Sequence, residues 1–154
     1  MKYKNQSDQL TKSEQRLGVL LVNLGTPDAP TSKAVRSYLA EFLSDPRVVA
    51  IPRFIWQIIL HGIVLRVRPK RSAEAYRSVW TEQGSPLLVI SKQQRQALRT
   101  RLEQIHPGRF KVGLAMRYGN PSIGDALAAL NQAGVRRLLI LPLYPQYSAT
   151  TTAS

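Results

Sequence analysis

The chain has 154 residues, of which 44% are apolar, and a net charge of +13 at pH 7. The apolar content excludes a disordered chain and is sufficient for one domain with a hydrophobic core. Because the chain contains no cysteine, disulfides, thiolate metal sites and a cysteine nucleophile are excluded.

The positive charge is concentrated in residues 47–111, which carry a net charge of +10. Such a segment favours a nucleic acid, an anionic membrane surface or a small polyanion as partner, although a merely solubilising surface has the same composition. Residues 1–16 are polar and contain no apolar segment of the kind that a secretory signal needs. We expect them to form a flexible lead-in to a cytoplasmic protein.

Residues 17–30, with the sequence LGVLLVNLGTPDAP, predict a strand that is apolar on both faces and ends at a glycine- and proline-rich turn. A helix is predicted to start at Thr31 or Ser32 and to end near Leu43, because apolar residues recur there at helical spacing. Open α/β folds bind ligands at the carboxyl ends of their strands. The turn after this first strand is therefore a candidate site.

Residues 47–71 contain an apolar run, Phe54–Leu65, with arginines before it and arginines and a lysine after it. About 12 residues are too few to cross a bilayer core of roughly 30 Å. The bracketing cations and Trp56 are typical of a membrane interface or of the apolar rim of a pocket. A buried helix with solvated ends is the alternative. Pro69 predicts a break, with a new helix from Ser72.

Two further helices are predicted. A capping box of Ser91 and Gln94 indicates the start of the first, whose basic outer face is interpreted as solvated. Ser122 and Asp125 indicate the start of the second, and Gly134 its end. The predicted buried face of the second helix consists of Ile123, Leu127 and Leu130.

Two more strands are predicted at about residues 110–116 and 138–143. The β-α-β-α-β order predicts an α/β fold, in which right-handed crossovers make the strands parallel and bring their carboxyl-terminal loops to one edge. Three strands are few for a parallel sheet, whose two faces must be covered. We therefore expect an incomplete domain, or one half of a larger protein.

Arg117 is the strongest single candidate for ligand binding. It directly follows an apolar strand, where a guanidinium can hold a carboxylate or phosphate through two parallel hydrogen bonds. A structural ion pair is the alternative. His61 and His106 lack the spacing of metal ligands and are interpreted as structural. The sequence also contains no dinucleotide, P-loop or nucleophile-elbow motif.

Five sequence blocks together resemble the ferrochelatase family, in the order in which that family has them. The blocks are LLVNLGTPDAP (ending at Pro30), FLSDPRVV (42–49), AYRSVWTEQGSPL (75–87), MRYGNPS (116–122) and LPLYPQYSATT (141–151). The resemblance covers residues 17–154. It implies the N-terminal half of a protein in which two Rossmann-like α/β halves, each a parallel sheet with flanking helices, hold a porphyrin between them.

The resemblance also implies a set of site residues. By position in the blocks, the residues that would bind the porphyrin are Leu24, Arg68, Tyr76, Ser85, Arg117, Tyr118 and Tyr147. Leu24 would line the face of the macrocycle, and Arg117 with Tyr118 would stand on the inner wall near the path of the metal. Residues 51–65, within the segment 47–71, would form the apolar lip that touches the membrane.

The function implied is the insertion of ferrous iron into protoporphyrin IX to form protoheme. Iron is then a substrate, and no cofactor or resident metal is expected in this segment. The family's catalytic histidine and its partner glutamate belong to the other half, so the chain is expected to be truncated and inactive alone. Iron–sulfur members carry a cysteine where this chain has Ala149, so no cluster ligand is expected.

Two alternatives remain open at the level of the sequence. One is a porphyrin- or heme-binding module without catalysis. The other is a basic protein that binds a membrane surface or nucleic acid through residues 47–111. No basic groove with interleaved aromatic residues is evident, so a nucleic-acid partner is not expected.

Overall fold

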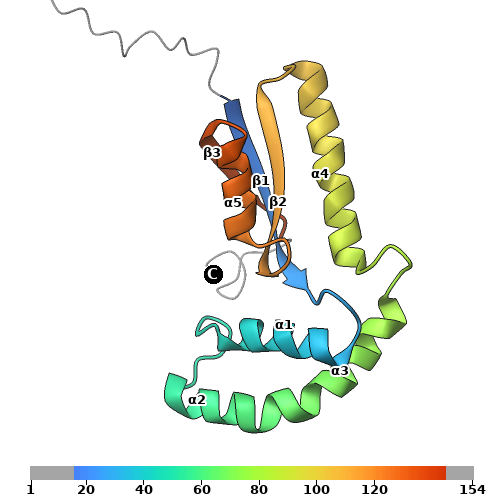
Figure 1. Ribbon diagram of the computed structural model, residues 1–154, viewed down its shortest axis with the longest axis vertical. Helices are drawn as coiled ribbons and strands as arrows, with labels where there is room; N and C mark the ends of the chain where they lie inside the picture. The colour runs from blue at the N-terminus through green and yellow to red at the C-terminus, as the bar shows by residue number, and fades with distance from the viewer. Residues whose placement is uncertain (1–15, 145–154) are drawn as a thin grey trace, which may run out of the picture.

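The computed structural model describes residues 16–144 and shows one three-stranded parallel sheet with helices on both faces and beyond one end (Figure 1). The strands are β1 (Arg16–Thr26), β2 (Phe110–Gly119) and β3 (Val135–Pro142), in the spatial order β2-β1-β3. Both pairings with β1 are parallel, which confirms the predicted α/β sheet. The first strand begins at the last residue of the predicted lead-in, and residues 1–15 lie outside the described part.

The central strand, β1, is covered on both faces because its side chains alternate between two clusters. Val19 and Leu21 pack with residues of α4 (Pro86–Ile105), whereas Leu20 and Val22 pack with residues of α5 (Ile123–Gln132). Figure 1 shows these two helices on opposite sides of the sheet. All four side chains are at most 8% exposed, as a strand buried on both faces requires.

A second group of helices lies beyond the carboxyl ends of the strands (Figure 1). It consists of α1 (Ser32–Ser44), α2 (Arg53–Ile59), the π-helical turn η2 (Leu60–Val64) and α3 (Leu65–Val79). Thr31 caps α1 as predicted, its side chain accepting a hydrogen bond from the backbone N–H of Ala34 at 3.3 Å. These helices place a third apolar cluster directly against the ends of β1 and β2.

Pro69 does not break the helix, so the predicted new start at Ser72 is wrong. The three segments α2, η2 and α3 follow one another without interruption, and Pro69 is buried inside α3. A proline removes one N–H and crowds the carbonyl four residues earlier, here that of Leu65. In the π turn just upstream, the N–H of Leu65 donates to the carbonyl of Leu60, five residues back. The π turn thus ends next to Leu65, the residue whose carbonyl Pro69 crowds.

The predicted capping box at Ser91 is also wrong, because α4 begins at Pro86 with Ser85 as its N-cap. Proline is well suited to the first helical position, since its missing N–H would have no partner there. Ser91 lies inside the helix, and its hydroxyl donates to the carbonyl of Leu87 at 2.7 Å. A serine bonded back to its own helix resembles a cap in sequence.

The cap of α5 is confirmed, whereas its predicted buried face is only partly correct. The Ser122 side chain accepts from the N–H of Asp125 at 3.1 Å. Leu130 is buried, but Leu127 is 39% exposed and Ala126 takes the buried position instead. The alanine lets the helix approach the sheet, and the stripe is centred one residue earlier than the leucines suggested.

The edge strand β3 is apolar in sequence yet exposed in the structure. Leu139 is 61% exposed and Ile140 55%, although the strand itself was predicted correctly. Within residues 16–144, β3 pairs only with β1, so one edge of the strand has no neighbouring strand. This is the least covered apolar part of the sheet.

Candidate active site

The ends of β1 and β2 meet in very close contact at Gly25, which lies opposite Tyr118 in the strand register. A Cβ at Gly25 would stand 1.8 Å from the carbonyl oxygen of Tyr118, and the residue has φ +115°. Only glycine fits such a contact and such a backbone. The predicted convergence of the first two loops at one edge is therefore confirmed; the third loop is described only as far as Tyr144.

An ion pair at this edge holds Arg117 against Asp45. Nη2 of Arg117 donates to Oδ2 of Asp45 at 2.6 Å, and the hydroxyl of Tyr118 donates to the same oxygen at 3.1 Å. The other oxygen, Oδ1, accepts from the backbone N–H of Arg47 at 2.8 Å. The Asp45 side chain is 7% exposed and that of Arg117 is 26% exposed. Arg117 therefore does form the structural ion pair that the sequence left open as an alternative. Its side chain is nevertheless partly exposed.

The surroundings of Asp45 keep it ionised. Burial alone would raise the pKa of this carboxyl, but the hydrogen bonds from Arg47 and Tyr118 and the charges of Arg117 and Arg47 outweigh burial and lower the pKa. The Arg117 guanidinium also lies over the ring of Tyr118, with Cζ 4.7 Å from the ring centroid. The cation is therefore held from two directions.

Aromatic side chains form an apolar wall beneath this ion pair. Tyr118 is only 1% exposed and its ring meets that of Phe42 edge-on at 5.1 Å between centroids. Phe42 in turn stacks on Tyr38, whose hydroxyl donates to the carbonyl of Gly25 at 3.3 Å. Leu24 and Tyr76 are partly buried against the same cluster. Burial raises the pKa of Tyr38 and that of Tyr76, so both phenols are neutral at pH 7.

A second polar contact joins the end of β1 to the start of α4. The hydroxyl of Thr26 donates to that of Ser85 at 2.8 Å, and the side-chain amide of Asn23 donates to the hydroxyl of Ser91 at 3.1 Å. Ser85 is 5% exposed. The structure therefore brings Ser85 to the predicted edge, where its side chain is buried and hydrogen-bonded to Thr26.

The continuous helix α2-η2-α3 presents an exposed apolar stripe. Phe54, Ile58, Ile63 and Val67 are 79%, 60%, 61% and 70% exposed. The alternative of a buried helix with solvated ends is wrong for these positions. Within residues 16–144, no helix combines the length and the apolar character needed to cross a bilayer.

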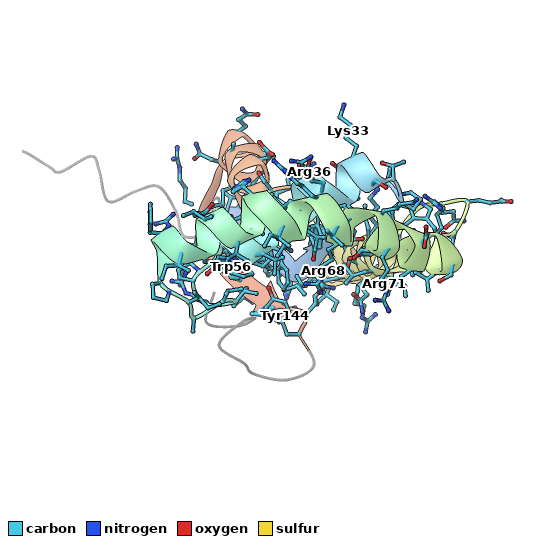
Figure 2. The ribbon with its side chains drawn as sticks, turned by 90° about the horizontal axis from the view of Figure 1, so that it is seen from below. Lys33, Arg36, Trp56, Arg68, Arg71 and Tyr144 are labelled. Atoms are coloured by element: carbon cyan, nitrogen blue, oxygen red, sulfur yellow. The ribbon has the colours of Figure 1, made fainter. Side chains whose placement is uncertain are left out.

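Exposed cations accompany this stripe. Figure 2 views the helix from below and shows Arg68 and Arg71 toward the same side as Tyr144, with Lys33 and Arg36 toward the opposite side. Burial raises the pKa of the Tyr144 phenol, and the positive charge of Arg117 opposes part of that rise. Tyr144 at the end of β3 therefore lies within electrostatic reach of Arg117, at the same edge of the sheet.

Two cavities lined by described residues lie near or beside the sheet. One of about 240 Å³ lies beside Thr26, Tyr38 and Gly119. A larger cavity of about 680 Å³ lies between α4 and α5 along the first half of β2, away from the predicted site residues. Pockets for organic ligands usually measure about 300–1,000 Å³. The larger cavity carries none of the chemistry just described.

The predicted site residues fall into three groups. Leu24, Tyr76, Arg117 and Tyr118 come together at the apolar cluster, and Ser85 lies next to it through Thr26. Arg68 is exposed on α3, and Tyr147 lies outside the described residues. His61 is exposed on η2, and the ring of His106 lies 5.9 Å from that of Phe110.

Asp45 is the residue that sequence reasoning missed. Its sequence context, Ser-Asp-Pro after a helix, is an ordinary turn signal and gives no hint of the contact with Arg117, 72 residues away. In the described part of the chain, no group of three or more histidine, aspartate or glutamate side chains could hold a metal ion.

The comparison with known proteins decides the family. A family model described as ferrochelatase matches residues 16–154. The chain belongs to the ferrochelatase family. The match includes the ends of all three strands and the exposed helix, and so covers every element of the site.

Curated ferrochelatases are closely similar over the same region. The protein of Thioalkalivibrio sulfidiphilus is 59% identical over the whole chain, which spans 42% of that relative. That of Marinobacter nauticus is 62% identical over 90% of the chain and 38% of the relative, and that of Idiomarina loihiensis is 54% identical over the whole chain and 42% of the relative. The chain thus spans about two fifths of the ferrochelatases it matches.

Proposed function

We propose that this chain supplies one wall of a ferrochelatase, which inserts ferrous iron into protoporphyrin IX to form protoheme. The observation that carries the proposal is the partly exposed Arg117 guanidinium at the carboxyl edge of a ferrochelatase-family sheet, set against an apolar wall. A porphyrin is a flat apolar ring with two carboxylates, so it needs both kinds of surface at once. The open edge suits a ligand covered on its other side by further protein.

In this proposal each residue has a physical task. Leu24 and Tyr76 offer apolar surface to the macrocycle, and the exposed Arg68 attracts a propionate. Arg117 stands on the inner wall with donors to spare, and Tyr118 supports it from beneath. Ser85 is buried and its hydroxyl accepts from Thr26, so binding the ligand requires a local rearrangement at this position. The assignment of Tyr147 rests on the family resemblance alone.

The residues that remove the pyrrole protons are expected to lie outside this chain. Metal insertion needs a base that takes the two pyrrole protons while an oxygen or nitrogen ligand delivers the iron. The family's histidine and glutamate for these steps are expected outside the blocks matched here, and we do not assign their role to His61 or His106. The chain alone is therefore expected to bind porphyrin without inserting metal.

We further propose that residues 51–65 dock on an anionic membrane surface as a peripheral contact of a cytoplasmic protein. The exposed apolar stripe and the neighbouring cations support this, because together they suit the boundary between headgroups and acyl chains. An apolar porphyrin could then enter from the membrane side without crossing water.

The function is tested by titrating the chain with protoporphyrin IX and recording its Soret band and fluorescence. Saturable binding is expected, and Arg68→Ala should weaken it about tenfold because a charged hydrogen-bond partner is lost. Arg36→Ala removes the same charge from α1, on the side opposite to Arg68 in Figure 2, and should leave binding unchanged. Absence of saturable binding by the unmodified chain would contradict the proposal.

A zinc-insertion assay on the same samples separates the alternatives. Binding without insertion is expected of this chain, with insertion by a longer ferrochelatase measured in parallel. Insertion by the chain alone at a comparable rate would overturn the assignment of the proton chemistry to residues outside it. Strongly salt-dependent DNA binding with no response to porphyrin would favour the nucleic-acid alternative.

A further inference from the structure

The carboxylate of Asp45 is fully engaged although it lies in a turn between helices. Its two oxygens accept three hydrogen bonds, from the Arg47 N–H, the Tyr118 hydroxyl and the Arg117 guanidinium, at 2.8, 3.1 and 2.6 Å. A buried carboxylate is tolerated only with such partners. Two of the three are residues of β2, so this turn is tied to the ligand edge of the sheet.

Arg117 is only partly committed to this contact. Within residues 16–144, Asp45 is its single hydrogen-bond partner and takes one donor, on Nη2. A guanidinium has five N–H donors in a rigid planar fork. With Oδ2 on one side and the Tyr118 ring 4.7 Å from Cζ, both the direction and the plane of the fork are set while most donors stay available.

The charges near the carboxylate preserve attraction for an anion. Arg47 lies 3.8 Å from Oδ1 of Asp45, and its side chain is 53% exposed. Two arginines and one aspartate leave this cluster one net positive charge. Asp45 therefore orients a cation without neutralising the edge.

We propose that Asp45 is a positioning residue, which acts through Arg117 by fixing the guanidinium fork toward the ligand at the carboxyl edge of the sheet. The proposal rests on the proposed function, because the ligand is taken to be the porphyrin. A merely structural Asp45 would secure the turn after α1 and would have no influence on which donors of Arg117 face outward.

The first test needs no porphyrin. In the unmodified chain, ¹⁵N NMR of the Arg117 side chain should show separate Nη signals, because the contact with Asp45 slows rotation of the guanidinium. Asp45→Asn should merge these signals, since an amide cannot replace the charged acceptor. Glu41→Gln is the matched control: this exposed carboxylate at the same edge accepts from the Gly119 N–H at 2.9 Å and does not touch Arg117. Merged signals in the unmodified chain would overturn the proposal.

The second test is a double-mutant cycle read by protoporphyrin IX affinity. Asp45→Asn and Arg117→Lys should each weaken binding by about tenfold, and the double variant should be no weaker than Arg117→Lys alone. Fully additive losses, or unchanged affinity in Asp45→Asn, would show that Asp45 does not act through Arg117. Glu41→Gln should bind as the unmodified chain does.

Two further measurements keep the result interpretable. Near-UV circular dichroism reports whether each variant folds. If Asp45→Asn does not, Tyr118→Phe removes one hydrogen bond to Oδ2 while retaining the ring, and should move both readouts less but in the same direction. Separate Nη signals that depend on Asp45, together with no porphyrin binding by the unmodified chain, would support the positioning of Arg117 by Asp45 and overturn the proposed ligand instead.

Discussion

At the scale of single residues, the close contact between strand ends depends on one glycine. Gly25 combines φ +115° with a position where a Cβ would strike the Tyr118 carbonyl. Gly84 has nearly the same φ, +112°, but no atom within 4 Å of its hypothetical Cβ. The chain therefore contains its own control for separating backbone strain from steric exclusion.

Gly25→Ala is expected to lower the free energy of unfolding by more than about 4 kcal/mol, a loss reached only by severe steric or strain effects. Gly84→Ala should cost about 1–2 kcal/mol, the penalty for a left-handed backbone at an alanine. Urea unfolding followed by circular dichroism measures both. Equal losses in the two variants would show that the approach to Tyr118 is unimportant.

Asp45 should also contribute a pH-dependent part of the stability. Its pKa in the folded chain lies below its ordinary value, which is about 3.9 in an unfolded chain. The stabilisation is therefore complete above about pH 4 and is lost as the pH falls through the folded-state pKa. Asp45→Asn should be less stable by about 2 kcal/mol at pH 7, and this gap should narrow below pH 4. A gap that stays constant from pH 7 to pH 3 would contradict the shift in pKa.

The role of a residue was predictable only where its neighbours in the sequence determine its position in the fold. Arg117 stands at the end of an apolar strand, so its place at the ligand edge follows from the fold class. Asp45 and Ser91 become understandable only through partners far away, 72 and 68 residues along the chain. Short-range patterns assigned Asp45 to a turn and Ser91 to a cap, and both assignments miss the long-range contact.

At the scale of elements, the π turn η2 keeps two stripes of the exposed helix in line. The exposed residues Phe54, Ile58, Ile63 and Val67 follow at intervals of four, five and four. The buried residues Leu60, Leu65, Pro69 and Ala73 follow at intervals of five, four and four. A five-residue step inside a π turn covers the same rotation as a four-residue step in an α-helix. The extra residue therefore disturbs neither the buried stripe nor the exposed apolar stripe.

Deleting Gly62 should consequently be tolerated. This glycine has no atom within 4 Å of its hypothetical Cβ, and its removal would convert the π turn into an α turn with both stripes preserved. Stability is expected to stay within about 1 kcal/mol of the unmodified chain. As the control, deletion of the exposed Glu74 would turn Tyr76 by about 100° away from the core and should cost about 2 kcal/mol or more. A large loss on deleting Gly62 would refute this account of the π turn.

The exposed stripe itself is tested by its affinity for lipid. Phe54→Ser combined with Ile58→Ser should weaken binding to phosphatidylserine-containing vesicles at least about tenfold, because two large apolar side chains no longer enter the interface. Urea stability should change by no more than about 0.5 kcal/mol, since both side chains are solvent-exposed.

Ile105→Ser is the matched control for this experiment. Ile105 is 50% exposed at the end of α4, outside the stripe, so its variant should bind vesicles normally. Undiminished binding of the double variant would exclude residues 51–65 as the membrane contact.

The elements themselves were largely predictable. All three strands and the caps of α1 and α5 follow from apolar runs and side-chain oxygens at helix starts, which are local signals. The boundaries of α3 and α4 were not, because burial of Pro69 and the fit of Pro86 to a first turn depend on tertiary packing and on cap geometry.

At the scale of the whole molecule, the exposed strand β3 and the net charge have opposite effects on self-association. In the order β2-β1-β3 both outer strands lie at an edge, and β3 is the more exposed of the two. Its apolar run resembles that of the central strand, so its exposure was not predictable from its composition. A long apolar edge is a template for pairing with another chain. A net charge of +13 keeps copies apart at low salt, with a reach set by a Debye length of about 10 Å at 0.1 M.

Self-association of the chain should therefore increase with salt. Dynamic light scattering of the unmodified chain is expected to show larger particles at about 1 M than at 0.05 M NaCl, because the Debye length falls to about 3 Å at the higher concentration. Leu139→Lys should suppress this growth. Leu139 is 61% exposed on the edge strand, where a lysine obstructs strand pairing at little cost to the fold.

Val67→Lys separates edge pairing from a simple effect of charge. It adds the same charge at a residue that is 70% exposed on α3, far in sequence from the edge strand. Since it leaves β3 unchanged, it should associate with rising salt as the unmodified chain does. Equal suppression by both lysines would attribute association to net charge, whereas suppression by Leu139→Lys alone would identify β3 as the surface at which copies meet.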